Sequence, residues 1–171
     1  EKGETVRVDI LSPEELLKLN DALIPISCHE LGCGAATYLT SRLLHEFRRT
    51  KRYNHEFSCI AIRVGKLIDI DSQESKIDAL KLVSQQISHS IRNTDEIFYL
   101  NEGVFIVLAP ETMANRVKTL STRITREVHN FFQVRAPEFA DLQIRVGTFS
   151  FDGRNAEDHN QILTKALGSC H

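Results

Sequence analysis

The sequence has no long apolar run, and its basic residues are not gathered into a stripe. No stretch of its 171 residues approaches the ~20 apolar residues that cross a bilayer, and no basic segment followed by an apolar one marks a signal peptide. The formal net charge is −2, with lysines and arginines scattered along the chain. Nucleic-acid backbones are usually neutralised by a concentrated basic surface. We therefore expect no membrane segment in this sequence and no duplex DNA or RNA as a partner.

Cysteine pairs with the spacing of a zinc site are also missing. The four cysteines form no C-x-x-C pair; Cys28 and Cys33 flank His29, and Cys170 precedes His171. Adjacent cysteine and histidine side chains rarely bind one ion together, so zinc is the weaker interpretation. Free thiols in a reducing cytoplasm are the better one. We expect no metal, no cofactor and a cytoplasmic location, either free or as the cytoplasmic part of a membrane-associated protein.

The hydrophobic pattern predicts one domain that mixes helices and strands. With 42% hydrophobic and 26% charged residues, the composition is typical of a globular protein. Apolar residues recur at helical spacing in some segments, whereas β-branched and apolar runs mark strands in others. The expected helices are residues 12–23, 34–54, 75–92, 113–132 and 156–167, and the expected strands are residues 57–64, 96–100, 104–109 and 141–151.

From residue 57 onward the predicted order is β-α-β-β-α-β. This is the ferredoxin-like arrangement, an α+β fold in which an antiparallel sheet carries its helices on one face. One extra helix precedes this core and another follows it. Because the arrangement hosts many unrelated functions, the function has to be argued from the site.

The segment RNTDEIFYLNEGVF, residues 92–105, carries a resemblance to a known family. It places an R-x-x-D motif five residues before the tip of a predicted hairpin. With the element order, this resembles the GGDEF domain of bacterial diguanylate cyclases, which has a nucleotide cyclase-like fold. The resemblance covers residues 34–171 and ends inside the family's last helix, so we expect a C-terminally truncated domain. Residues 1–33 are expected to be a helix and linker to another domain, and the start at Glu1 rather than Met indicates a fragment.

The residues that carry the family's chemistry are replaced in this sequence. The signature G-G-D-E-F falls on NEGVF, residues 101–105, where only the packing residue Phe105 is kept. In the family the glycines admit a triphosphate and an acid after them holds a metal, whereas the acidic positions are Gly103 and Val104 here. The second metal ligand falls on Arg63, a cation that repels Mg²⁺. Because phosphoryl transfer depends on metal and positioning, the resemblance implies a degenerate domain that is not an enzyme.

The R-x-x-D motif is kept, as Arg92 and Asp95. In the family this is the inhibitory site for the product, cyclic di-GMP, and an arginine of the helix after the hairpin falls on Arg123. A neighbouring domain can supply another arginine, for which Arg49 is the candidate. Guanidinium groups suit phosphate or the guanine O6/N7 edge, and a carboxylate can accept the guanine N1–H and N2–H. We expect Arg92 and Asp95 to face one side at a helix end, and both residues and Arg123 to lie on the surface.

Three functions are open at this point. The favoured one is a cyclic di-GMP receptor, alone or as a homodimer, that controls exopolysaccharide secretion and biofilm, motility or a partner enzyme. The second is a degenerate domain for dimerisation or docking to a partner protein, in which Arg92 and Asp95 form an exposed ion pair. The third is an active nucleotide cyclase with an unorthodox metal site. Asp69 and Asp71 are candidates for such a site, although solvated loop carboxylates are the better interpretation.

Overall fold

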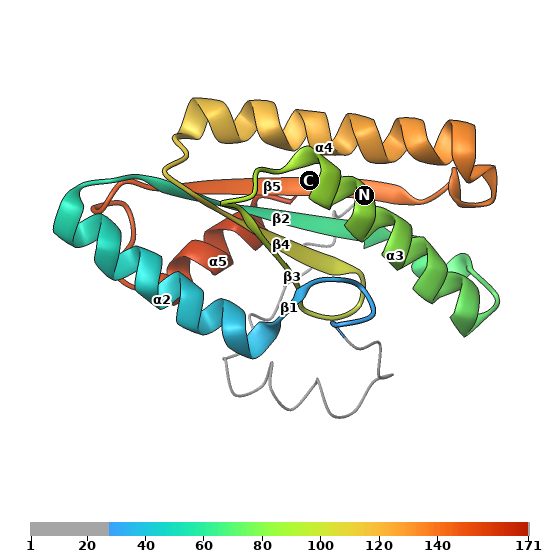
Figure 1. Cartoon of the computed structure of the whole chain (residues 1–171), viewed down its shortest axis with the longest axis horizontal. Coiled ribbons are helices and arrows are strands. Elements are labelled where there is room, and N and C mark those ends of the chain that lie inside the picture. The colour runs from blue at the N-terminus through green and yellow to red at the C-terminus, as the bar shows by residue number, and fades with distance from the viewer. Residues whose placement is uncertain (1–27, 171) are drawn as a thin grey trace, which may run out of the picture.

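The computed structural model describes residues 28–170, in which helices cover both faces of one sheet (Figure 1). The helix expected at residues 12–23 and most of the expected junction 1–33 lie outside the described residues. The helices are α2 (Ala36–Tyr53), α3 (Gln73–Ser90), α4 (Ala114–Arg135) and α5 (His159–Gly168). The strands are β1 (Gly34–Ala35), β2 (Phe57–Gly65), β3 (Glu96–Tyr99), β4 (Val104–Pro110) and β5 (Gln143–Phe151).

The strand order across the sheet is β1-β3-β4-β2-β5. β1 is parallel to β3, and the other neighbouring pairs are antiparallel. β2 pairs with β5 over its whole length and with β4 over most of it. The run β2-α3-β3-β4-α4-β5 confirms the predicted βαββαβ core, and α2 and α5 are the extra helices before and after it.

The alternation of side chains along β2 creates a hydrophobic core on each face of the sheet. Ile60, Ile62 and Val64 belong to the core that α3 and α4 cover, whereas Cys59 and Ala61 belong to the core that α2 and α5 cover. Successive side chains of a strand point to opposite faces, which explains the division. The two helices of the ferredoxin-like core thus share one face, as predicted, and the extra helices share the other.

α3 begins and ends at different residues from those that the hydrophobic pattern predicts. It starts at Gln73 because the Ser72 hydroxyl, at the N-cap, accepts the Ser75 N–H (3.0 Å). It ends at Ser90, and Ile91 after it has an extended backbone. Arg92 therefore lies in the loop between α3 and β3 rather than at the end of the helix.

A tight turn joins β3 to β4 at the N-E-G tip. The Val104 N–H donates to the Asn101 carbonyl (2.8 Å), and Glu102 and Gly103 both have positive φ, 45° and 78°. These are the features of a type I′ turn, whose twist matches that of the flanking strands. The Gly103 N–H also donates to the Tyr99 hydroxyl (3.1 Å). The predicted hairpin is confirmed, and Gly103 occupies a position that favours glycine.

We expect Gly103→Ala to lower the free energy of unfolding by about 2–4 kcal/mol, through backbone strain and overpacking. An added Cβ would lie 2.5 Å from Leu67 Cδ1 and 2.9 Å from the Val64 carbonyl oxygen. Gly32→Ala is the matched control, since Gly32 also has positive φ (67°) but an added Cβ would meet no described atom within 4 Å beyond its chain neighbours. That control should lose only about 1–2 kcal/mol. Urea unfolding measures both, and equal losses would contradict close packing at the tip.

Candidate ligand-binding site

The R-x-x-D motif forms a closed turn after α3. The Arg92 N–H donates to Asp95 Oδ2 (2.9 Å), and the Asp95 N–H donates to the Arg92 carbonyl (3.0 Å). A short acidic side chain that bonds to a nearby backbone N–H is a common way to fix a turn. The expectation that Arg92 and Asp95 lie at a helix end is therefore wrong, because α3 ends at Ser90, before Arg92. The two side chains are brought together by the turn instead.

Asp95 is buried rather than exposed, which corrects the expectation of a surface residue. Its exposed fraction is 8%, and its Oδ1 atom has no hydrogen-bond partner among residues 28–170. Burial raises the pKa of this carboxyl above its ordinary value, against the opposing effects of the Arg92 N–H and the charges of Arg92 and Arg123. A buried carboxylate oxygen without a donor is costly, so this oxygen is suited to a ligand that brings an N–H.

α4 brings Arg123 to the same place. One Arg123 guanidinium nitrogen donates to the Ser90 carbonyl, at the C-terminal end of α3. Arg92, Asp95 and Arg123 then line one cavity of about 420 Å³, which we call the α3–α4 pocket. The remaining lining residues are Thr112, Asn115, Arg116, Thr119 and Leu120.

The sequence prediction missed the lining residues at the start of α4. The spacing of Arg116, Thr119 and Arg123 on one helix is the signal that could have found them, since residues three, four and seven apart share a helix face. Thr112 is buried between β4 and α4, where its carbonyl accepts the Ser58 hydroxyl (2.6 Å). This contact fixes the chain just before the pocket wall formed by α4.

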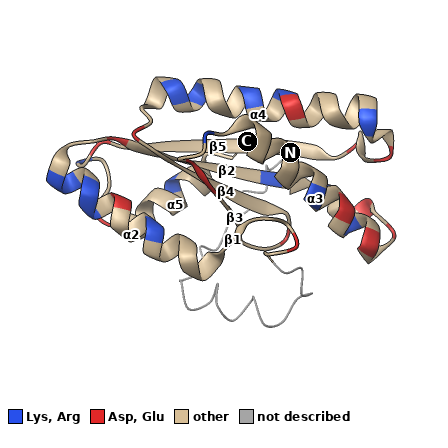
Figure 2. Cartoon of the chain, in the orientation of Figure 1, with Lys and Arg blue, Asp and Glu red and all other residues tan. Residues whose placement is uncertain are grey.

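The structure does not bring Arg49 to the α3–α4 pocket. Arg49 lies on α2, whose basic residues are visible in Figure 2, and its guanidinium pairs with Glu111 Oε1 (2.5 Å) and Glu46 Oε2 (3.5 Å). It lines a separate depression on α2 with Arg48 and Arg52. Arg49 is therefore occupied by carboxylates of its own chain.

The cavity beside the hairpin tip is lined by more apolar residues than the α3–α4 pocket. A cavity of about 530 Å³ beside it is lined by lysines and apolar residues as well as by the turn itself, with Lys66, Lys76, Leu67, Leu80 and Glu102 among them. Much of its wall is hydrocarbon, with one carboxylate at the turn.

The residues at the positions where the resemblance places metal ligands do not fit a divalent cation. Arg63 lies directly opposite Val104 on β4 and Arg145 on β5, so a cation and an apolar side chain stand beside the hairpin tip. In residues 28–170 no group of three or more His, Cys, Asp and Glu side chains is placed to hold a metal ion. Divalent magnesium and calcium require oxygen ligands, which these positions do not offer.

None of the helices that the structure describes is long and apolar enough to cross a membrane.

Comparison with known proteins identifies the fold. No family model and no curated protein matches this sequence. Among solved structures, the chain is similar to the diguanylate cyclase SiaD of Pseudomonas aeruginosa in complex with its activator SiaC, with a TM-score of 0.72 and 18% identity. That match covers 90% of this chain and 58% of the SiaD chain, so this chain spans less than two thirds of that protein.

Two further structures give the same result. The coiled coil and GGDEF domain of DgcB from Caulobacter crescentus, in complex with c-di-GMP, matches with a TM-score of 0.73 and 11% identity, over 82% of this chain and 75% of that one. The active GGEEF domain of a diguanylate cyclase from Vibrio cholerae matches with a TM-score of 0.71 and 17% identity, over 81% and 88%. The chain has the fold of GGDEF domains, and the predicted α+β, cyclase-like architecture is confirmed.

We expect Asp95→Asn to become more stable relative to the wild type as the pH rises from acid to neutral. The folded-state pKa of Asp95 is raised, so the folded state holds its proton to higher pH than the unfolded state and loses stability as that proton leaves. Asparagine does not titrate and keeps an oxygen for the Arg92 N–H. Asp95→Ala should instead lose about 1–2 kcal/mol, because that N–H loses its acceptor.

Chemical unfolding of wild type, Asp95→Asn and Asp95→Ala at several pH values measures these differences. Asp141→Asn, at an exposed aspartate, controls for the substitution itself. A difference between Asp95→Asn and wild type that does not change with pH would contradict the burial of this charge.

Proposed function

We propose that this chain is a GGDEF-fold domain that binds cyclic di-GMP in the α3–α4 pocket without synthesising it. It would act as a receptor that controls a downstream process, such as exopolysaccharide secretion and biofilm, motility or a partner enzyme, in the cytoplasm of a bacterium. The observation that carries the proposal is the meeting of Arg92, buried Asp95 and Arg123 around one cavity. Arg92 and Asp95 come from the turn after α3, and Arg123 comes from α4. The fold therefore brings Arg123 to the other two residues.

The chemistry of the pocket suits a guanine dinucleotide. Arg92 and Arg123 can each engage a phosphate or the O6/N7 edge of guanine through two N–H groups. Asp95 can accept the guanine N1–H and N2–H, which would supply the donor that its Oδ1 atom lacks. The cavity of about 420 Å³ falls within the range of small-molecule sites. DgcB, with the same fold, was solved in complex with c-di-GMP, so the fold is compatible with this ligand.

The replacement of the catalytic residues supports the absence of synthesis. Arg63 stands where the resemblance places a metal-binding aspartate, beside Val104. The family's acidic side chain would start at Gly103, where an added Cβ would meet Leu67 and the Val64 carbonyl. The hairpin tip is therefore packed around a glycine, and an acid cannot be accommodated there without local rearrangement.

A second candidate function is docking to a partner protein without nucleotide binding. Tyr38 and Tyr53 on α2 are large aromatic side chains with exposed fractions of 54% and 55%, and tyrosine is enriched at protein interfaces. SiaD was solved in complex with its activator SiaC, so a chain that contains this fold can bind a protein. This function becomes the better one if cyclic di-GMP does not bind.

We expect no cyclic di-GMP to form when the protein is incubated with GTP and Mg²⁺ or Mn²⁺, because the metal positions lack carboxylates. Chromatography of the reaction against a blank without protein measures this. Arg63→Asp alone should not restore activity, since Gly103 and Val104 would still leave the metal without its other ligand. Product above the blank from the wild type would contradict the proposed loss of catalysis.

We expect the wild type to bind cyclic di-GMP and Arg92→Ala to bind it about 10- to 100-fold more weakly. Losing a charge-assisted hydrogen bond costs roughly 1.5–3 kcal/mol. Asp95→Ala should abolish the preference for cyclic di-GMP over cyclic di-AMP, whereas Arg123→Ala should weaken both ligands if it contacts phosphate. Isothermal titration calorimetry measures the affinities, with GTP as the control ligand and circular dichroism to verify folding. Absence of heat with the wild type, or wild-type affinity in Arg92→Ala, would leave partner docking as the function.

A further inference from the structure

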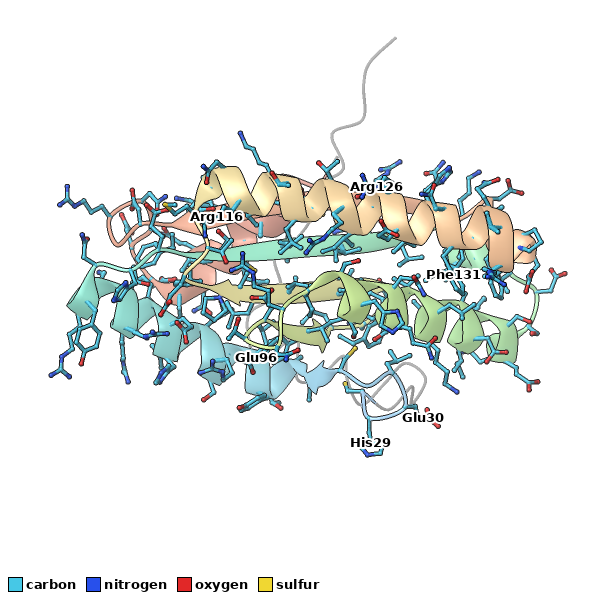
Figure 3. The ribbon with its side chains drawn as sticks, turned by 45° about the horizontal axis from the view of Figure 1, so that its top comes forward. His29, Glu30, Glu96, Arg116, Arg126 and Phe131 are labelled. Carbon is cyan, nitrogen blue, oxygen red and sulfur yellow. The ribbon has the colours of Figure 1, made fainter. Side chains whose placement is uncertain are left out.

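Arg116 is an arginine of the α3–α4 pocket whose side chain has no partner among residues 28–170. It lies near the N-terminal end of α4, two turns before Arg123, and its side chain is exposed (Figure 3). Among residues 28–170 its guanidinium makes no ion pair and no hydrogen bond, although the residue lines the cavity. Arg123, by contrast, donates to the Ser90 carbonyl. Arg116 is thus free to bind an anion that enters the pocket.

The charge of the lining matches a ligand with two phosphates. The charged residues that line the cavity are three arginines and one acid, so its formal charge is +2. They are Arg92, Arg116, Arg123 and Asp95. Cyclic di-GMP carries one negative charge on each of its two phosphates. Arg116 and Arg123 are separated by seven residues, or roughly 10 Å along α4, so the two guanidinium groups start from well-separated points on one helix.

The start of α4 adds to the positive potential at this end of the pocket. The N-cap residue, Met113, provides no side-chain acceptor, and the first turn has no acidic residue. The N-terminus of a long helix carries a partial positive charge that favours anions. This effect supports the arginine beside it, because Arg116 lies in the same first turn.

We infer that Arg116 contacts the ligand and that the α3–α4 pocket binds cyclic di-GMP with the residues of a single chain. This inference rests on the proposed function and deepens it, since it names a further affinity determinant and removes the need for an arginine from a second copy. Arg49, the candidate for that role, is held by Glu46 and Glu111. Its release would break two ion pairs within its own chain.

The inference is tested by calorimetry with cyclic di-GMP on four variants. Arg116→Ala should bind about 10-fold more weakly than wild type, and Arg116→Lys should be intermediate because lysine keeps the charge but not the planar fork. Arg126→Ala is the matched control, since Arg126 is an exposed arginine of the same helix that pairs with Glu127 (3.2 Å) and does not line the pocket. Arg126→Ala and Arg49→Ala should stay within about 2-fold of wild type.

Light scattering with and without saturating cyclic di-GMP completes the test. The expected result is a molar mass that the ligand does not change. Wild-type affinity in Arg116→Ala would overturn the inference while leaving the proposed function in place. A ligand-induced increase in molar mass that Arg49→Ala abolishes would also overturn the inference and leave the proposed function in place. If the wild type binds no cyclic di-GMP, both the proposed function and this inference are wrong.

Discussion

The buried carboxylate of Asp95 is the group on which the proposed site depends. Its Oδ2 atom closes the turn after α3 by accepting the Arg92 N–H, and this turn sets the direction in which Arg92 enters the α3–α4 pocket. Its Oδ1 atom has no partner within the described residues, at a position whose burial raises the pKa of the group. One oxygen therefore maintains the structure and the other is available for a ligand. A neutral side chain could serve the first role but would accept guanine donors less strongly.

The hairpin between β3 and β4 is held by core packing and by the backbone geometry of its turn. Phe105 is fully buried and its ring lies 5.0 Å from that of Tyr99, so the hairpin stays anchored in the core. The tip needs only a backbone that turns within two residues, which Glu102 and Gly103 provide. Metal binding would need carboxylates at positions that Arg63, Gly103 and Val104 occupy. The packing of this hairpin therefore does not require a carboxylate at any of those three positions.

The order of the helices and strands could be predicted from the sequence, because a local pattern of residues marks each element. The apolar, β-branched strand 57–64, the helical stripes of α3 and α4 and the N-E-G turn each carry their own signal. The end of α3 at Ser90 could not be predicted, since Ile87 and Ile91 continue the helical spacing while the backbone already extends. The burial of Asp95 and the ion pair between Arg49 and Glu111 depend on contacts between distant segments. Such contacts are set by tertiary packing, which no local pattern of residues reports.

We propose that cyclic di-GMP occupies the α3–α4 pocket and not the hairpin tip. Hydrogen–deuterium exchange of the intact chain, with and without the ligand, tests it most directly because it reports both places at once. We expect slower exchange at residues 91–95 and 112–123, which include the residues that line the pocket, and no change at residues 64–68 and 99–104 around the tip. Slower exchange at the tip with none at the pocket would contradict it.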